Sequence, residues 1–262
     1  MRRLVRTSDG VDLAIVEFGG AGDPILLLHG LMGRATTWWA VAEKLTAFGR
    51  VLGLDARGHG RSAARGPWGT DRMAADVTEL LAEVGPAVVV GHSMGGLHGL
   101  VAAARRPDLV RALVVEDMGV DFRGRDAEAV RAWFGAMPQP FPSLAAVRQA
   151  FGWPRAEFGE YMAECVEERA DGYHLLAAVE HTTEIAAEWA ARDQWDAVAA
   201  IQCPTLLVEA EESVAPAGQM DLMAARMPAA THVLVRGTGH LVHAGAPEAY
   251  RAAIEAFLST HM

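Results

Sequence analysis

The sequence predicts an α/β protein with a mostly parallel, doubly wound sheet and an inserted helical cap. Three observations lead to this fold class. Short runs rich in Val, Ile and Leu alternate with amphipathic stretches, the runs lack the strict alternation of half-exposed strands, and one long segment interrupts the pattern. With 262 residues, 51% of them hydrophobic, the chain is long enough for one large core and a smaller appendage.

Six apolar runs are expected to be strands that are covered on both faces. In chain order they read PILLLHG, RVLGLDARG, AVVVGHS, RALVVEDM, PTLLVEA and THVLVRGTGH. Helical patterns lie between them, for example at 72–84 and 246–258. This alternation indicates parallel strands joined by helices. Ligands of such sheets bind beyond the carboxyl ends of the strands, so the residues that follow each run are the first candidates for a site.

The segment 119–200 contains no clear strand and many aromatic side chains. We expect it to form a helical cap, and residues 1–118 and 201–262 to form the core. An insertion of this length has to bury its own apolar side, most economically over the carboxyl edge of the sheet. Its aromatic residues are Trp133, Phe134, Phe141, Phe151, Trp153, Phe158, Tyr161, Trp189 and Trp195.

Composition and charge exclude several classes of partner. The net charge of −10 argues against nucleic acid, whose binding requires basic patches. No apolar run approaches the length of a membrane span, and the N-terminal segment turns polar too early for a signal peptide. Cys165 and Cys203 lack metal-site spacing and are expected to be free thiols. With no phosphate-binding or dinucleotide motif, we expect a cytoplasmic protein with a small-molecule substrate and no cofactor or metal.

Ser93 is the candidate nucleophile. The stretch GHSMG (91–95) follows a valine-rich strand and opens a helical stretch, which is the context of a nucleophile elbow. The glycines relieve crowding in this tight turn while the serine hydroxyl is held above the sheet. The backbone N–H groups of Leu31 and Met94 can face the same point and are the expected oxyanion donors. His92 is expected to diverge from its neighbour on the turn.

His240 is the candidate base, because it follows the last expected strand and precedes the last expected helix. An imidazole at this place can reach back over the sheet to the serine. His243 is the rival base, although the chain is by then entering the helix. Asp55, Arg57 and His59 follow another strand and are expected to brace their loop without taking part in the chemistry.

The acid that would orient the histidine has several candidates. Glu209, Glu211 and Glu212 lie at the end of the PTLLVEA strand, while Glu116 and Asp117 end the RALVVEDM strand. Side chains alternate along a strand, so only one of the last two can face the histidine. The residues alone leave this choice open.

The motifs HGLMG, DARGHGRS, GHSMGG, CPTLLVEAE and GTGHLVHAGAPEAY resemble those of the α/β-hydrolase superfamily, serine esterase type. They cover the core at both ends, whereas the cap matches only in position and helical character. In most relatives the acid follows the strand that matches PTLLVEA, in a pattern like G-x-x-D. Ser213 stands at the position of that aspartate in this chain.

The sequence is most similar to a branch of small bacterial esterases and their mitochondrial relatives. There the acid follows the preceding strand, the sixth, in a pattern like V-x-x-D-[IM]-x-P-V-D-[YF]. Residues 114–122 read VVEDMGVDF, without the proline and one residue shorter. The branch also tends to have a serine where Ser213 stands, and a motif like G-H-x-V-H-x-x-x-P, which 239–247 match. The resemblance implies Asp117 as the acid, with Glu212 as the main rival.

The spacing of strands permits this displacement. Neighbouring strands lie about 4.8 Å apart, so an acid moved by one strand shifts its origin by roughly the length of a side chain. The RALVVEDM strand is expected to lie beside the strand of the nucleophile, and the histidine loop can absorb the change.

The motifs and the resemblance imply a serine hydrolase that cleaves carboxylic esters, thioesters or lactones of small apolar acyl or aromatic substrates through an acyl-enzyme. Two alternatives use the same triad: cofactor-free haloperoxidase or perhydrolase activity, and carbon–carbon bond hydrolysis or lyase chemistry. A third alternative is a homologue that binds a ligand with hardly any turnover, since a fold does not by itself define a function.

Overall fold

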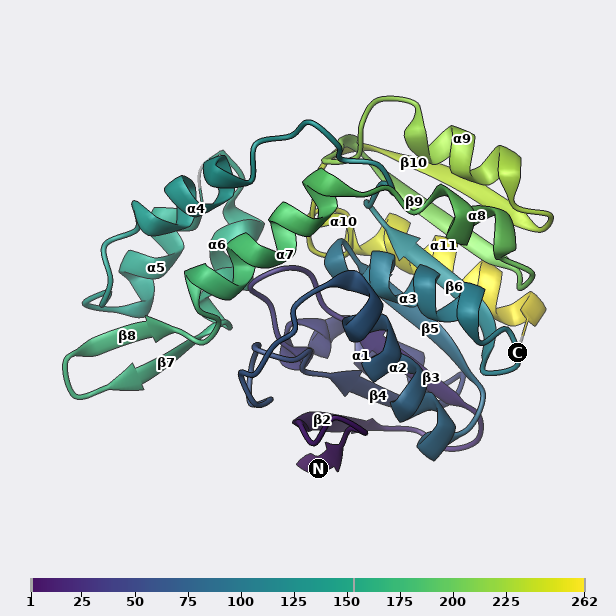
Figure 1. Cartoon of the computed structure of the whole chain (residues 1–262), viewed down its shortest axis with the longest axis horizontal. Helices are drawn as coiled ribbons and strands as arrows, with labels where there is room; N and C mark the ends of the chain where they lie inside the picture. Colours follow the sequence, from purple (N-terminus) through teal and green to yellow (C-terminus); the bar gives the residue numbers. More distant parts are fainter. Residues whose placement is uncertain (1, 153, 262) are drawn as a thin grey trace.

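The computed structural model describes residues 2–152 and 154–261; Trp153, one of the aromatic residues expected in the cap, lies outside them. Within these residues an eight-stranded sheet forms the centre of the molecule, in the order β1-β2-β4-β3-β5-β6-β9-β10 (Figure 1). Its strands are β1 (Arg2–Arg6), β2 (Asp12–Gly19), β3 (Pro24–Leu28), β4 (Arg50–Leu54), β5 (Ala87–His92), β6 (Val110–Glu116), β9 (Thr205–Glu212) and β10 (Ala230–Gly239).

The mostly parallel sheet expected from the sequence is confirmed. All six apolar runs are strands, and the six strands β4-β3-β5-β6-β9-β10 pair with one another in parallel. The structure adds two antiparallel strands, β1 and β2, at one edge. β1 reads RRLVR, and such charged residues protect an edge strand from further pairing but hide it from a search for apolar runs.

Helices cover both faces of the sheet, which gives a three-layered core. The apolar side chains of β3 and β5 are buried on both sides, as expected for central parallel strands. One face packs against α1 (Trp39–Leu45) and α11 (Pro247–His261). The other face packs against α2 (Thr70–Val84), α3 (Met94–Arg105), α8 (Trp195–Ala200) and α9 (Gln219–Arg226) (Figure 1). Among the described residues, no helix has the length and apolar character to cross a membrane.

The segment between β6 and α8 extends to one side of the sheet, at the left of Figure 1. It contains α4 (Ala127–Gly135), α5 (Leu144–Phe151), α6 (Ala156–Ala163), β7 (Val166–Arg169), β8 (Gly172–Leu175) and α7 (Val179–Ala191). Its apolar side chains form a cluster of their own, in which Met32 and Leu241 of the core take part. This cluster ties the insertion to the loops after β3 and β10.

The expected helical cap also contains two short strands that were not recognised in the sequence. β7 and β8 pair as a two-stranded antiparallel hairpin. Their sequences, VEER and GYHL, are four residues long and mostly polar, so neither shows the apolar run by which the other strands were found. The hairpin is held from outside by Phe141, whose backbone exchanges hydrogen bonds with Tyr173 at 2.8 and 2.9 Å.

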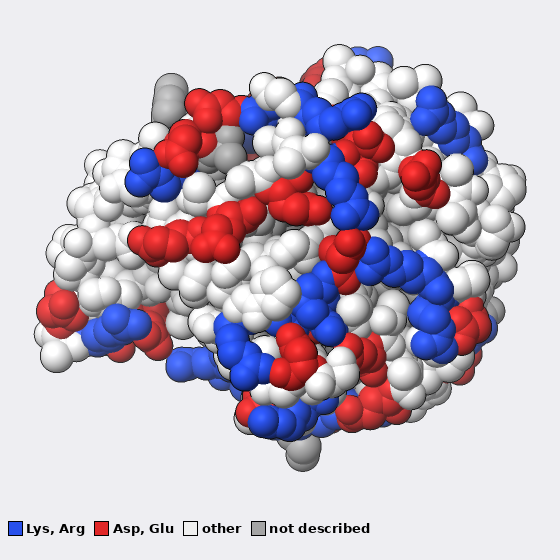
Figure 2. Space-filling model, in the orientation of Figure 1, with Lys and Arg blue, Asp and Glu red and all other residues white. Residues whose placement is uncertain are grey.

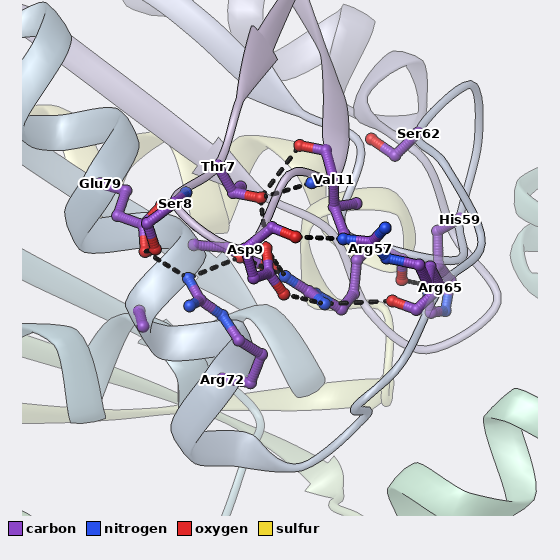
Figure 3. Close-up of polar contacts among 12 residues, drawn as sticks. Thr7, Ser8, Asp9, Val11, Arg57, His59, Ser62, Arg65, Arg72 and Glu79 are labelled. Atoms are coloured by element: carbon purple, nitrogen blue, oxygen red, sulfur yellow. Dashed lines mark hydrogen bonds and ion pairs between the residues drawn. The ribbon is translucent and has the colours of Figure 1, made fainter.

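A buried arginine holds the loop after β4. Arg57 has no exposed surface and donates to both carboxylate oxygens of Asp76, each at 2.7 Å. It also pairs with Asp9 of the β1–β2 turn at 3.0 Å (Figure 3). Asp55 accepts hydrogen bonds from the backbone N–H groups of Ala35 and Arg61. These contacts join the loop to α2 and to the edge of the sheet, in agreement with the bracing role expected from the sequence.

Charges of both signs are interspersed over the face shown in Figure 2, and acidic side chains follow the line of α7. Most of the ion pairs join half-exposed groups, such as Arg106 with Asp108. Pairs of this kind contribute little to stability, about 0–1 kcal/mol each. The buried Arg57 cluster is therefore the electrostatic contact that matters most for this part of the fold.

We expect Arg57→Met to lower the free energy of unfolding by about 3–5 kcal/mol, because the buried Asp76 carboxylate loses the two hydrogen bonds from Arg57 and keeps only its contact with Arg72 at 2.9 Å. Urea unfolding followed by circular dichroism measures the change. Arg106→Met removes an exposed ion pair and is the matched control, with an expected loss of at most about 1 kcal/mol. Equal losses of unfolding free energy in the two variants would show that the buried Arg57 cluster stabilises the fold no more than an exposed ion pair does.

Candidate active site

Ser93 lies at a strained turn between β5 and α3. Its φ of 51° and ψ of −121° are unusual for a residue with a side chain, and such strain persists only where the surroundings enforce it. The Ser93 N–H donates to the carbonyl oxygen of Glu116 at 2.8 Å. A Cβ on Gly91 would lie 2.4 Å from the carbonyl oxygen of Gly95, and one on Gly95 would lie 2.3 Å from that of Leu28. Both glycines of the motif are therefore sterically required.

Asp117 and His240 are in direct contact. The Nδ1 of His240 lies 2.7 Å from Oδ2 of Asp117. The carboxylate is fully buried and also accepts from the N–H groups of Ala210 at 3.0 Å and Val214 at 3.2 Å. Burial alone would raise the pKa of Asp117, but hydrogen bonds from His240, from Ser213 and from the Ala210 N–H hold it below its ordinary value. The carboxyl group is thus held as an anion that orients the ring.

Ser213 lies near Asp117, at the position where most relatives carry the acid. Its side chain is one of the groups that lower the pKa of the Asp117 carboxyl. A carboxylate at position 213 would place a second negative charge near the first. A serine at this position is therefore compatible with Asp117 as the candidate acid.

The rival acids lie elsewhere. Glu212 is largely exposed and pairs with Arg155 at 2.7 Å. Glu211 accepts from the N–H of Gly237, and Glu209 pairs with His232. None of these contacts involves His240.

Glu116 faces away from Asp117, as the alternation along a strand predicts, and forms a second histidine–carboxylate pair. Its Oε1 accepts from the N–H of His243 at 3.0 Å and lies 2.8 Å from Nδ1 of the same residue. Trp38 stacks on the His243 ring at 4.5 Å. Burial would raise the pKa of Glu116, but electrostatic attraction to His243 and hydrogen bonds from its ring and backbone lower it to about 2. His243, the rival base, is therefore engaged below the site.

The expectation that His92 diverges from the site is wrong. Its ring centroid lies 4.5 Å from that of His240, and its Nε2 is 3.0 Å from the backbone oxygen of His240. Burial, together with the nearby charge of His240, lowers the pKa of His92 to about 3, so the ring is neutral and can donate to this oxygen. His92 supports the histidine loop from beneath.

A cavity of about 420 Å³ opens above these groups, between the core and the insertion. Ser93, His240 and Leu31 lie in its wall, and Met94 is the first residue of α3, so its N–H has no acceptor within the helix. The other lining residues are mainly apolar: His92, Met118, Phe122, Arg125, Asp126, Ala129, Val130, Trp133, Phe134, Phe158, Tyr161, Ala186, Trp189, Ala190 and Val214.

The structure thus shows lining residues that the sequence could not identify. Trp133, Phe158 and Tyr161 were expected in the cap, but nothing in the sequence separated the residues that face the cavity from the core of the insertion. Within the described ranges, no three His, Cys, Asp or Glu side chains form a group that could hold a metal ion.

A strained serine on a strand-to-helix turn, with a histidine held by a buried carboxylate beside the same cavity, defines a hydrolase built on an α/β sheet. The sequence profile of the Alpha/beta hydrolase family matches residues 25–253. The chain belongs to this family, and the resemblance inferred from its motifs is confirmed.

Similar proteins include lipases, esterases and other hydrolases. A 120-residue stretch is 40% identical to an sn-1-specific diacylglycerol lipase of Danio rerio, covering 44% of this chain and 38% of the lipase, so the match spans less than half of that protein. Esterase YbfF of Escherichia coli is 26% identical over 249 residues, covering 90% of this chain and 93% of the esterase. The crystal structure of an E-2-(acetamidomethylene)succinate hydrolase superposes with a TM-score of 0.89 at 26% identity and covers 99% of both chains.

We expect Glu116→Gln to destabilise the fold in a pH-dependent way. The folded pKa of about 2 lies below the ordinary 4.5, so the ionised Glu116 carboxylate stabilises the fold above pH 4.5, and this effect is lost as the pH falls towards 2. The free energy of unfolding of wild type minus variant should be largest near neutral pH and shrink over this interval. Denaturant titrations at several pH values measure it, with the exposed Glu128→Gln as control. A difference in unfolding free energy that does not change with pH would contradict the conclusion that the ionised Glu116 carboxylate stabilises the fold.

Proposed function

We propose that the protein is a carboxylesterase that hydrolyses uncharged, apolar esters through an acyl-enzyme on Ser93. One observation carries the proposal: the 2.7 Å contact between His240 Nδ1 and buried Asp117, in the wall of the cavity that Ser93 also lines. A cytoplasmic location, expected from the sequence, stays a prediction.

The proposed chemistry follows from the nitrogen that Asp117 leaves free. Because Nδ1 of His240 is held by the carboxylate, Nε2 is available to take the proton of the Ser93 hydroxyl as its oxygen attacks the substrate carbonyl. The N–H groups of Leu31 and Met94 are proposed to donate to the resulting oxyanion, each contributing about 3 kcal/mol to the lowering of the barrier. His240 then gives its proton to the leaving alcohol, and the same histidine activates the water that hydrolyses the acyl-enzyme.

The walls of the cavity support an apolar substrate. Phe122, Phe134, Trp189 and three alanines line the cavity together with Ser93. Aromatic and aliphatic walls bind acyl chains by removing apolar surface from water. Similarity to a diacylglycerol lipase and to a bacterial esterase supports the same substrate class. Thioesters and lactones would meet the same groups.

A second candidate is hydrolysis of a carboxylate-bearing substrate, as the name of the succinate-derivative hydrolase describes for that protein. Arg125 favours it, because this arginine lines the cavity and lies over the Phe122 ring at 5.2 Å. Asp126 lines the same end and offsets the positive charge. The uncharged ester is therefore our first choice.

We expect Ser93→Ala to lower kcat/KM for p-nitrophenyl butyrate by at least about 10⁴-fold and to abolish labelling by a fluorophosphonate probe, because both require the serine oxygen. Ser259→Ala, an exposed serine near the end of α11, should react like wild type. Wild-type turnover by the first variant would end the proposal, and labelling without any ester turnover would favour the haloperoxidase-like alternative.

We expect Asp117→Asn to reduce kcat by about 10⁴-fold, since the histidine then loses the group that fixes its tautomer. Glu212→Gln should lower kcat by less than about tenfold, because Glu212 pairs with Arg155 and not with His240. Steady-state kinetics on the same ester compare the two. A collapse of activity in the second variant only would make Glu212 the acid.

A further inference from the structure

A second cavity, of about 290 Å³, adjoins the first. The two share Trp133, Phe158 and His240 as lining residues, whereas Ser93 and Leu31 line only the larger one. The histidine therefore stands between two compartments, and the serine opens into one of them. The residues that line the second cavity are Trp133, Phe151, Pro154, Arg155, Glu157, Phe158, Glu212, Gly239, His240 and Leu241.

Because Ser93 lines only the larger cavity, the acyl half and the alcohol half of an ester can be assigned to different cavities. The serine and the oxyanion donors hold the carbonyl carbon, from which the acyl chain and the alkoxy oxygen point in different directions. The alkoxy oxygen has to come within hydrogen-bond reach of His240, which gives it the proton taken from Ser93 as the carbon–oxygen bond breaks. The leaving alcohol therefore belongs on the histidine side of the carbonyl. We propose that the second cavity is the leaving-group subsite and accepts a bulky, uncharged aryl or aralkyl alcohol.

The apolar walls of the second cavity fit such an alcohol. Trp133 lies 5.7 Å from Phe158 and 5.8 Å from Phe151 between ring centroids, and these three rings form one side. Leu241, next to His240, adds an aliphatic surface. Aromatic rings prefer offset or edge-to-face neighbours at such spacings, so a ring on the alcohol finds matching partners.

The charged residues of the second cavity argue against an anionic leaving group. Arg155 pairs with Glu212 at 2.7 Å, donates to the backbone oxygen of Gly237 at 3.1 Å and lies 3.9 Å from Glu157. One positive charge thus faces two negative ones, and the arginine is already engaged. The described residues that line this cavity therefore offer no unpaired cation to a leaving group that carries a negative charge.

The wall formed by Arg155 is fixed relative to the histidine loop. A Cβ on Gly239 would lie 2.6 Å from Cδ of Arg155, so the arginine packs directly on the backbone next to His240. Arg155 precedes α6 of the insertion, whereas Gly239 ends β10 of the core. This contact keeps the second cavity in place beside the ring.

The subsite rests on the proposed esterase activity and is tested with three butyryl substrates: methyl butyrate, benzyl butyrate and the butyryl thioester of coenzyme A. Wild type should prefer benzyl over methyl by at least about tenfold in kcat/KM and turn over the anionic thioester least. Glu157→Trp narrows only the second cavity and should lower kcat/KM for the benzyl ester at least about tenfold, with the methyl ester within twofold. Hydrolysis of the common butyryl-enzyme, measured in a burst experiment, should be unchanged because the alcohol has already left.

Two matched variants complete the test. Glu160→Trp adds the same side chain on α6 outside both cavities and should leave all rates unchanged. Ala190→Leu narrows the first cavity and should slow long acyl chains, such as methyl octanoate, whatever the alcohol. Equal losses for benzyl and methyl esters in Glu157→Trp, or thioester turnover as fast as that of the benzyl ester, would overturn the subsite alone. Absence of all turnover, with Ser93 unlabelled by a fluorophosphonate, would overturn the proposed function and the subsite with it.

Discussion

The hydrogen bond between His240 and Asp117 is the contact on which the rest of the site depends. It fixes which imidazole nitrogen faces the cavity, and it requires a buried anion where burial alone favours the neutral acid. The backbone N–H groups of Ala210 in β9 and Val214 after it supply the missing stabilisation, together with the side chain of Ser213. The strand beside that of Ser93 can therefore carry the proposed acid, because β9 and the residues after it stabilise its charge.

Two consecutive carboxylates, one at the end of β6 and one just after it, point in opposite directions and contact different histidines. Asp117 points to the histidine in the cavity wall, and Glu116 points to the buried His243 under it. Both histidines belong to one short loop and helix after β10, so the two pairs hold this segment from opposite sides. His92 adds a third contact through the backbone oxygen of His240. The loop that carries the proposed base is thus held rigidly, which favours a preorganised site.

The sequence was informative where a residue's role follows from local pattern. Apolar runs located six strands, and the turn motif located Ser93 between a strand and a helix. Alternation along β6 separated Glu116 from Asp117. Contacts that depend on distant segments were missed: the charged strand β1, the polar hairpin of β7 and β8, and the approach of His92 to a residue almost 150 positions later. Such pairings arise from tertiary packing, which leaves no periodic signal in a single sequence.

The most direct test of the displaced acid is an NMR measurement of the His240 ring in protein with isotope-labelled histidine. A short hydrogen bond from Nδ1 to a buried carboxylate moves the bound proton to a field well below that of ordinary amides. Our account predicts such a resonance in the wild type, its survival when Glu212 is neutralised, and its loss when Asp117 is replaced by asparagine. The buried pair of His243 and Glu116 gives a second such proton, which is identified by its loss in Glu116→Gln. A low-field resonance of His240 that persists without the carboxylate at position 117 would contradict the account.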